Sequence, residues 1–506
     1  MANKISWAFA LCCVVLLSWG ADVRAFRVMD KLDIGGYLQN ETAFSTVADG
    51  DALWCENRLI VYGTYNYDAN VRLFFRLQGY YDALQDVQSD NYEEISGSHY
   101  VNDWKTHYRD LYWEPVSYTS SEVLKEFFLD ITMPKFDLRI GKQQFAWGVT
   151  DGLKVLDIVY PQDFRKFNQE DFEESRIPLW SLKLDYYVGT DSAIQLIYLP
   201  RFEPAFAGGA GHPFSVWGNE FADVAEKYGI STFGIPTSFN ITEDRPRASM
   251  NNSEVGAMWR QNFGPWSYTI NYFHHYTDTP APYDNGAVLY GGLLGLMGIP
   301  QVQNLELRYK MVESFGGSFD ATLSDLPLIG SIILRLEALY NHNNVHFTGT
   351  GEPLLVPIQN LDNGAVIWEA GEPLPEPKRE DDWMYAIGVD KMVLTDLFLS
   401  LQFIQSHIRK WDSTFVHPLT GKEIRDNERW VSFLIQKDWL NERMWTKCLV
   451  VAGQHGDNWI QPQISYLFRD KVKLLAMGNF YGGAPNRMWS RFDDADNVML
   501  RVTYQF

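Results

Sequence analysis

The chain ends on a strict alternation of apolar and polar side chains that runs from Asn497 to Phe506. A period of two indicates a β-strand whose successive side chains point to opposite faces. An apolar face set against a polar face that includes Arg501 is typical of a barrel strand with lipid outside and water inside. We therefore expect a membrane-facing barrel strand here. Its apolar face carries Val498, Leu500, Val502, Tyr504 and Phe506.

Alternating segments of about 10 to 14 residues recur from residue 33 onward, separated by connections that are short and long in turn. Bacterial barrels have tight periplasmic turns and longer extracellular loops, so the short connections should all face the periplasm. These are Asp68–Asn70, Met133–Lys135, Gly189–Asp191, Gly264–Pro265, Ser324–Gly330, Thr395–Asp396, Leu440–Arg443 and Arg469–Lys471. The long ones, expected outside the cell, lie near 86–121, 148–178, 200–252, 277–300, 344–380, 412–427 and 484–496.

This spacing predicts an all-β fold, a single transmembrane antiparallel β-barrel of about 18 strands (about 16 to 18) with long extracellular loops. An even number of strands places both ends of the barrel in the periplasm. Residues 301–322 fit either one long strand or two short ones.

The first 25 residues have the features of a secretory signal peptide. Lys4 provides a basic start, an apolar run extends from Trp7 to about Trp19, and Val23-Arg24-Ala25 stands where a cut is expected. The apolar run is shorter than the roughly 20 residues of a spanning helix. We expect a mature chain of 26–506 in the bacterial outer membrane, in contact with its lipids and lipopolysaccharide.

Composition agrees with a barrel and argues against some partners. Aromatic residues make up 15% of the chain, and aromatic girdles at the two membrane interfaces would use them. The formal charge of −21 argues against binding to nucleic acid. Only Cys55 and Cys448 follow the signal peptide, so a disulfide-rich scaffold is not expected.

Residues 148–178 carry the chemistry most open to a functional interpretation. Exposure of apolar residues such as Leu156, Val159 and Phe167 to water would be unfavourable. We therefore expect this connection to fold inward onto the barrel wall and form a constriction. Acidic residues of the connection would then oppose basic residues of the wall. The expected lining residues are Arg72, Arg76, Arg139, Lys183, Asp151, Asp157, Asp163, Asp171, Glu173 and Arg176. The alternative is a hydrophobic cap over the mouth, with its carboxylates solvated or paired to Lys154, Arg165, Lys166 and Arg176.

Residues 139–187 also resemble a known family. Arg139-Ile140-Gly141-Lys142-Gln143, Trp147-Gly148, Asp151-Gly152-Leu153, Asp157, Pro161, Asp163, Asp171-Phe172-Glu173, Arg176-Ile177-Pro178 and Trp180 are similar to the central motif of the outer-membrane family called domain of unknown function 1302. The likeness extends to Gly35–Thr42 and to the strand that starts at Arg58. It implies an exported barrel without an assigned substrate, and work beside periplasmic or inner-membrane transport components.

The C-terminal strand resembles the assembly signal of bacterial outer-membrane barrels, with Tyr504 and Phe506 as its aromatic residues. The barrel-assembly machinery is then a partner during biogenesis.

The function that we expect is a channel or transporter passing small solutes or lipophilic compounds across the Gram-negative outer membrane. The sequence has no G-x-S-x-G, H-E-x-x-H or phosphate-binding loop motif, so we expect no enzyme, no cofactor and no metal. Two alternatives remain: a structural or adhesive barrel that binds an external partner through its loops, and an outer-membrane hydrolase.

Overall fold

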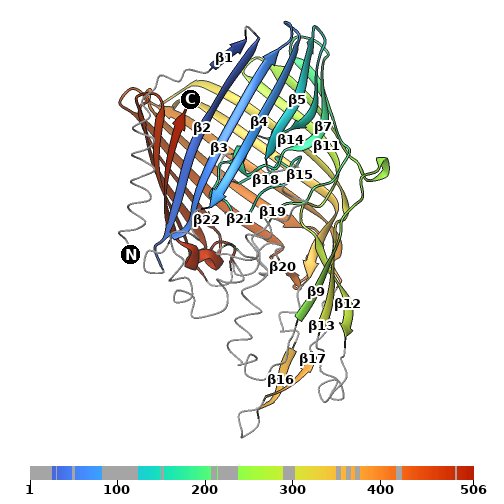
Figure 1. The fold of residues 1–506 in the computed structure, drawn as a ribbon. Coiled ribbons are helices and arrows are strands. Elements are labelled where there is room, and N and C mark those ends of the chain that lie inside the picture. The colour runs from blue at the N-terminus through green and yellow to red at the C-terminus, as the bar shows by residue number, and fades with distance from the viewer. Residues whose placement is uncertain are drawn as a thin grey trace.

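The computed structural model describes residues 26–29, 31–47, 52–82, 123–148, 150, 153–206, 214, 238–288, 302–348, 355–360, 366–370, 376–416, 424–484 and 487–506. Within these ranges, 18 antiparallel strands close into a barrel, in which each strand pairs with the next and β25 returns to pair with β2 (Figure 1). The predicted all-β antiparallel barrel of about 18 strands is thus confirmed. Residues 1–25, the expected signal peptide, lie outside the described residues.

The first half of the wall is built from β2 (Leu32–Ser45), β3 (Ala52–Asn66), β4 (Val71–Asp82), β5 (Leu124–Met133), β6 (Phe136–Gln143), β7 (Leu179–Tyr187), β8 (Ser192–Leu199), β10 (Glu254–Phe263) and β11 (Trp266–Tyr276). The second half is built from β14 (Met311–Leu326), β15 (Gly330–Thr348), β18 (Lys378–Val393), β19 (Leu397–Ile408), β21 (Asn427–Trp439), β22 (Met444–Gly453), β23 (Asn458–Phe468), β24 (Val472–Gly482) and β25 (Asn497–Gln505).

Each of the eight predicted tight turns joins two paired strands, so all eight lie at one end of the barrel. Their residues suit such turns. Gly264 and Gly330 adopt the positive φ values that glycine allows, and Leu440, Asn441 and Glu442 also take positive φ values in the turn between β21 and β22.

The long connections at the other end contain strands of their own. The first is a three-stranded sheet of β9 (Ser238–Asp244), β12 (Ala281–Val288) and β13 (Val302–Arg308), in which β13 and β9 run parallel. The second is a hairpin of β16 (Leu355–Asn360) and β17 (Val366–Ala370). Both lie beyond the barrel end in Figure 1. Residues 301–322 are therefore two segments, since β13 belongs to the outer sheet and β14 to the wall.

Two short strands are appended to the barrel sheet, β1 (Phe26–Met29) beside β2 and β20 (Phe415–Val416) beside β15. The helical elements are short: α6 (Phe172–Ser175), η2 (Met250–Asn252) and η3 (Ser490–Ala495). Among the described residues, no helix has the length and apolar character needed to cross a membrane.

Alternation along the strands separates an apolar outer face from a mostly polar inner face. Trp180 and Leu182 are exposed outside, while Ser181 and Asp185 between and beside them are buried inside. A continuous apolar exterior on a closed barrel satisfies every backbone group within the wall, as a strand structure in lipid must.

The seam of the barrel is formed by the two ends of the chain. Gly36 and Phe506 exchange two backbone hydrogen bonds, each 3.0 Å between nitrogen and oxygen. A Cβ on Gly36 would lie 2.7 Å from the Phe506 ring, so the ring packs directly over this glycine. Phe506 also packs against a cluster of Val472, Val502 and Tyr504.

Candidate functional site

The connection between β6 and β7 is anchored to the inner face of β15. The backbone N–H groups of Thr150 and Leu156 donate to the two carboxylate oxygens of Glu337, at 2.9 and 3.1 Å. Gly148, with φ 95°, opens the connection, and a Cβ there would lie 3.0 Å from the same carboxylate. Glycine is thus needed where the chain turns inward.

The same connection reaches a different part of the wall through Lys166. Its ammonium group donates to Glu41 of β2 at 2.8 Å and also to Glu56 of β3. In the strand order, β2 and β15 lie about half the circumference apart. The connection therefore contacts inward side chains on two nearly opposite sides of the barrel.

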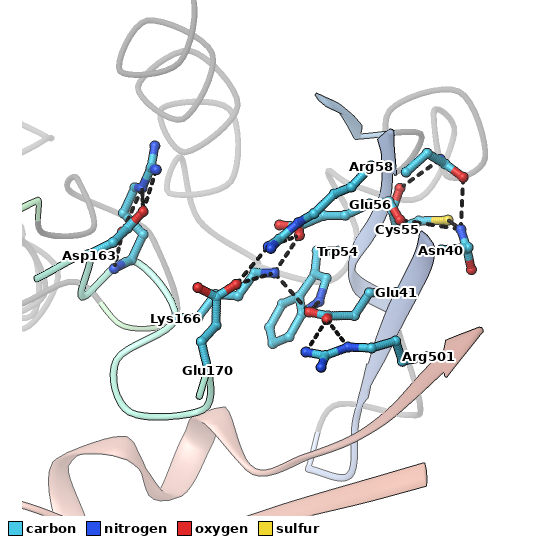
Figure 2. A network of polar contacts seen from close by, with 12 residues as sticks. Asn40, Glu41, Trp54, Cys55, Glu56, Arg58, Asp163, Lys166, Glu170 and Arg501 are labelled. Carbon is cyan, nitrogen blue, oxygen red and sulfur yellow. Dashed lines mark hydrogen bonds and ion pairs between the residues drawn. The ribbon is translucent and has the colours of Figure 1, made fainter. Parts of the chain in front are cut away.

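Figure 2 shows the charged groups around Lys166. Three carboxylates, of Glu41, Glu56 and Glu170, alternate with three cations, of Arg58, Lys166 and Arg501. Arg58 and Glu170 are 2.6 Å apart, and so are Arg501 and Glu41. The charges balance, as they must where ions leave bulk water.

The pKa values of the connection's own charges reflect this network. Burial alone would raise the pKa of Glu170, but Arg58 and Lys166 outweigh it and lower that pKa to about 2. Burial would lower the pKa of Lys166, yet Glu41 and Glu56 raise it. Both residues are consequently charged at neutral pH and hold the connection to the wall.

The tip of the connection, residues 166–170, also packs on aromatic rings. Phe167 adopts φ 51°, which is unusual for a bulky residue, and its ring lies 4.4 Å from that of Phe492 between centroids. Tyr481 donates to the side-chain oxygen of Asn168 at 2.9 Å. The ring of Trp489 also packs on that of Phe167. The connection before β25, which includes η3, therefore packs on residues 153–178.

Closer to its start, the connection packs on a second apolar cluster. Leu156, Val159 and Tyr160 are almost fully buried, together with Trp147 and wall residues such as Phe273. A Cβ on Gly316 of β14 would lie 2.4 Å from Leu156, so this inward glycine makes room for the leucine. The apolar residues of the connection are thus packed against the wall and not exposed to water.

The predicted lining residues are mostly ion-paired. Their partners are Asp130 for both Arg72 and Arg139, Glu174 for Arg76, Asp185 for Lys183, Arg176 and Lys154 for Asp157, and Arg165 for Asp163. Asp171 and Glu173 are exposed. Asp151 lies outside the described residues.

One acidic residue of the connection, Glu174, lies 2.6 Å from a basic residue of the wall, Arg76. Asp157 and Asp163 instead pair within the connection, with Arg176 and Arg165. At Lys166 the charges are arranged the other way round: the cation belongs to the connection and the carboxylates of Glu41 and Glu56 belong to the wall.

Sequence reasoning missed Glu41 and Glu56 as anchors and η3 as a packing partner. The signal for the two carboxylates was available, since both occupy positions of β2 and β3 that alternation turns inward. No comparable signal exists for η3. Among the described residues, no group of three or more possible metal ligands is found.

A closed barrel with an apolar exterior and a connection packed on its inner wall defines the class of outer-membrane β-barrel proteins. The model of the family described as "Protein of unknown function (DUF1302)" matches residues 58–506. The chain belongs to this family, which confirms the resemblance of its central motif.

Several solved structures align with most of the chain at low identity. Pseudomonas aeruginosa OccK3 (OpdO) has a TM-score of 0.49 and 8% identity, and the alignment covers 95% of this chain and 96% of that one. Acinetobacter baumannii OccAB1 has a TM-score of 0.48 and 9% identity, with 94% and 95% covered. The outer membrane channel DcaP of Acinetobacter baumannii has a TM-score of 0.39 and 8% identity, with 96% and 100% covered. None of these likenesses assigns a substrate, and no curated protein matches the chain.

Proposed function

We propose that this protein is an outer-membrane channel whose lumen is narrowed by residues 148–178. Large barrels, such as porins of 16 to 18 strands, are wide enough to leave an aqueous channel unless something fills it. The observation that carries the proposal is the pair of anchors, Glu337 on one side and Glu41 with Glu56 on the other. A segment held at both places crosses the lumen.

The anchors favour a constriction over a cap lying on the mouth. A cap would contact only the ends of the strands, whereas Glu337 lies near the middle of β15 and Glu41 lies inside β2, four residues before its last residue Ser45. Charged side chains elsewhere on the inner wall, such as the half-exposed Arg72, would then act on permeating ions.

Single-channel recording in planar bilayers tests this function. Deleting Asp163–Glu174 should raise the conductance, because the narrowest section sets the resistance. The control deletes residues 355–370, which include the β16–β17 hairpin outside the barrel, and should leave the conductance unchanged (Figure 1). Wild-type protein that forms no channels, or equal conductance in the two deletions, would contradict the proposal.

An adhesive barrel is the second candidate, and the outer sheet of β9, β12 and β13 favours it. This sheet lies beyond the barrel end and could meet a partner outside the cell. The two functions differ in the same recordings, because adhesion requires no ion conductance.

A further inference from the structure

Three side chains of the wall, Glu41, Trp54 and Glu56, surround the ammonium group of Lys166 and form what we call the ammonium pocket (Figure 2). The ammonium group donates to Glu41 at 2.8 Å and also to Glu56, and it lies 5.2 Å from the centroid of the Trp54 ring. The indole N–H of Trp54 donates to Glu41 at 3.1 Å and so holds the ring and this carboxylate together. All three wall side chains are buried.

The pocket suits a primary ammonium group better than other cations of the same charge. A primary ammonium has three N–H donors, and the pocket offers two carboxylates and the face of an indole ring. A quaternary ammonium has the charge but nothing to donate. Glu170 adds a third carboxylate, 3.4 Å from the Lys166 nitrogen, but it belongs to the connection and is present only while the tip is docked. The two wall carboxylates stay behind when the tip leaves.

The tip that carries Lys166 is docked in a partly unfavourable conformation. Phe167, the next residue, has φ 51°, which is strained for a bulky side chain. Among the described residues, Asn168 Nδ2 and Gln169 Oε1 have no hydrogen-bond partner although both atoms are buried. Water would satisfy both atoms if the tip left the wall. Strain and unmet hydrogen bonds therefore oppose docking directly beside Lys166, and the ion pairs of the pocket oppose release.

We propose that the ammonium pocket binds the primary ammonium group of a cationic solute, and that Lys166 fills it as an internal ligand when no solute is present. A solute that enters while the tip is released keeps Lys166 from returning, because two ammonium groups in one pocket repel each other. The solute thus selects the released form and shifts the equilibrium toward it. The resulting opening of the constriction rests on the proposed channel function, whereas binding to the pocket does not.

The competing explanation is that Lys166 only fixes the connection in place, and that an added amine acts through ionic strength alone. Screening weakens ion pairs whatever the added cation is. Under that explanation, n-propylammonium and tetramethylammonium have equal effects, and neither salt strengthens docking in any variant. Replacing Lys166 by alanine removes three carbons and the nitrogen, which together have the size of n-propylammonium. This probe can therefore take the place of the missing group.

The test is hydrogen exchange at the Gln169 amide of the detergent-solubilised full-length protein, since this N–H donates to the Lys166 carbonyl at 3.1 Å and reports docking. In the wild type, n-propylammonium chloride at about 0.1 M should lower protection at least about threefold more than tetramethylammonium chloride does. In K166A, n-propylammonium should instead raise protection at least about threefold, because the docked pocket with Glu170 binds it more tightly than the released one. The control K410A removes a lysine that is 73% exposed beyond the end of β19 and should respond as the wild type does.

Equal effects of the two salts on the wild type, or no gain of protection in K166A, would overturn the proposal. Should K166A fail to fold, the comparison of the two salts on the wild type carries the test alone. Single-channel recording separates this proposal from the channel function. Opposite responses of the wild type and K166A in a protein that conducts no ions would refute the channel and keep the pocket, whereas conductance with equal responses to both salts would refute the pocket and keep the channel.

Discussion

The ion pairs of Glu170 give a quantitative prediction for the strength of the inward anchor. The pKa of this carboxyl falls from 4.5 to about 2 because of Arg58 and Lys166, and its side chain is only 11% exposed. A shift of this size corresponds to about 3 kcal/mol of stabilisation of the docked connection at neutral pH. In the variant E170Q, the equilibrium between docked and released forms should therefore shift by up to about 300-fold toward release.

Hydrogen exchange of the full-length protein measures this shift locally. The N–H of Gln169 donates to the Lys166 carbonyl at 3.1 Å, and the N–H of Asp163 donates to the Ser175 carbonyl at 2.7 Å. Both amides should lose protection in E170Q, while amides in the strands should not. The control is E173Q, which removes an exposed carboxylate of α6, three residues further along the same connection.

The pH dependence has a definite sign. Since the pKa of Glu170 is lowered in the docked state, its contribution is complete above about pH 4.5 and is lost as the pH falls toward 2. After correction for intrinsic exchange, wild-type protection should decline across this window. Protection in E170Q should start lower and change less there. Wild-type protection in E170Q at pH 7 would refute the assignment of Glu170 as an anchor.

Three further variants test other contacts. F506D should reduce the heat-modifiable folded band on a gel, because a charge replaces the ring that packs on Gly36; normal surface levels would show that this seam is unimportant. R72Q/R76Q should shift the reversal potential toward cation selectivity with little change in conductance, since two wall cations are removed; an unchanged potential would place them away from the ion path. G148A should cost about 1–3 kcal/mol of docking, because alanine is strained at φ 95° and meets Glu337; protease resistance of residues 153–178 equal to the wild type would contradict this.

The fold could be predicted from the sequence because a barrel strand exposes its two faces to different solvents. Because of that contrast, apolar and polar side chains alternate along each strand. The alternation located all eight tight turns, for example Gly264–Pro265 between β10 and β11. The same periodicity could not tell wall strands from outer strands. It left 301–322 undecided because β13 and β14 follow one another with only Tyr309 and Lys310 between them.

The site was predicted less completely because its contacts are distant in sequence. Apolar residues such as Leu156 and Val159 indicated that the connection packs somewhere, without naming the strand that receives it. Lys166 pairs with Glu41, which is 125 residues away in the sequence. The spacing of residues along the chain cannot reveal a pair so distant. A charged residue of the connection can also pair with a near neighbour in the sequence and not with the wall, as Asp163 does with Arg165.

The order of the chain has a consequence for biogenesis. Leu156 binds Glu337, which follows it by 181 residues, and Asn168 binds Tyr481, which follows it by 313. The connection is thus synthesised long before its docking partners, and its contacts form only once the wall from β15 to β24 is in place. A barrel whose strands have just paired would then have an unnarrowed lumen for a time. In a cell that inserts many copies, the rate at which the connection docks would set how long the outer membrane is leaky.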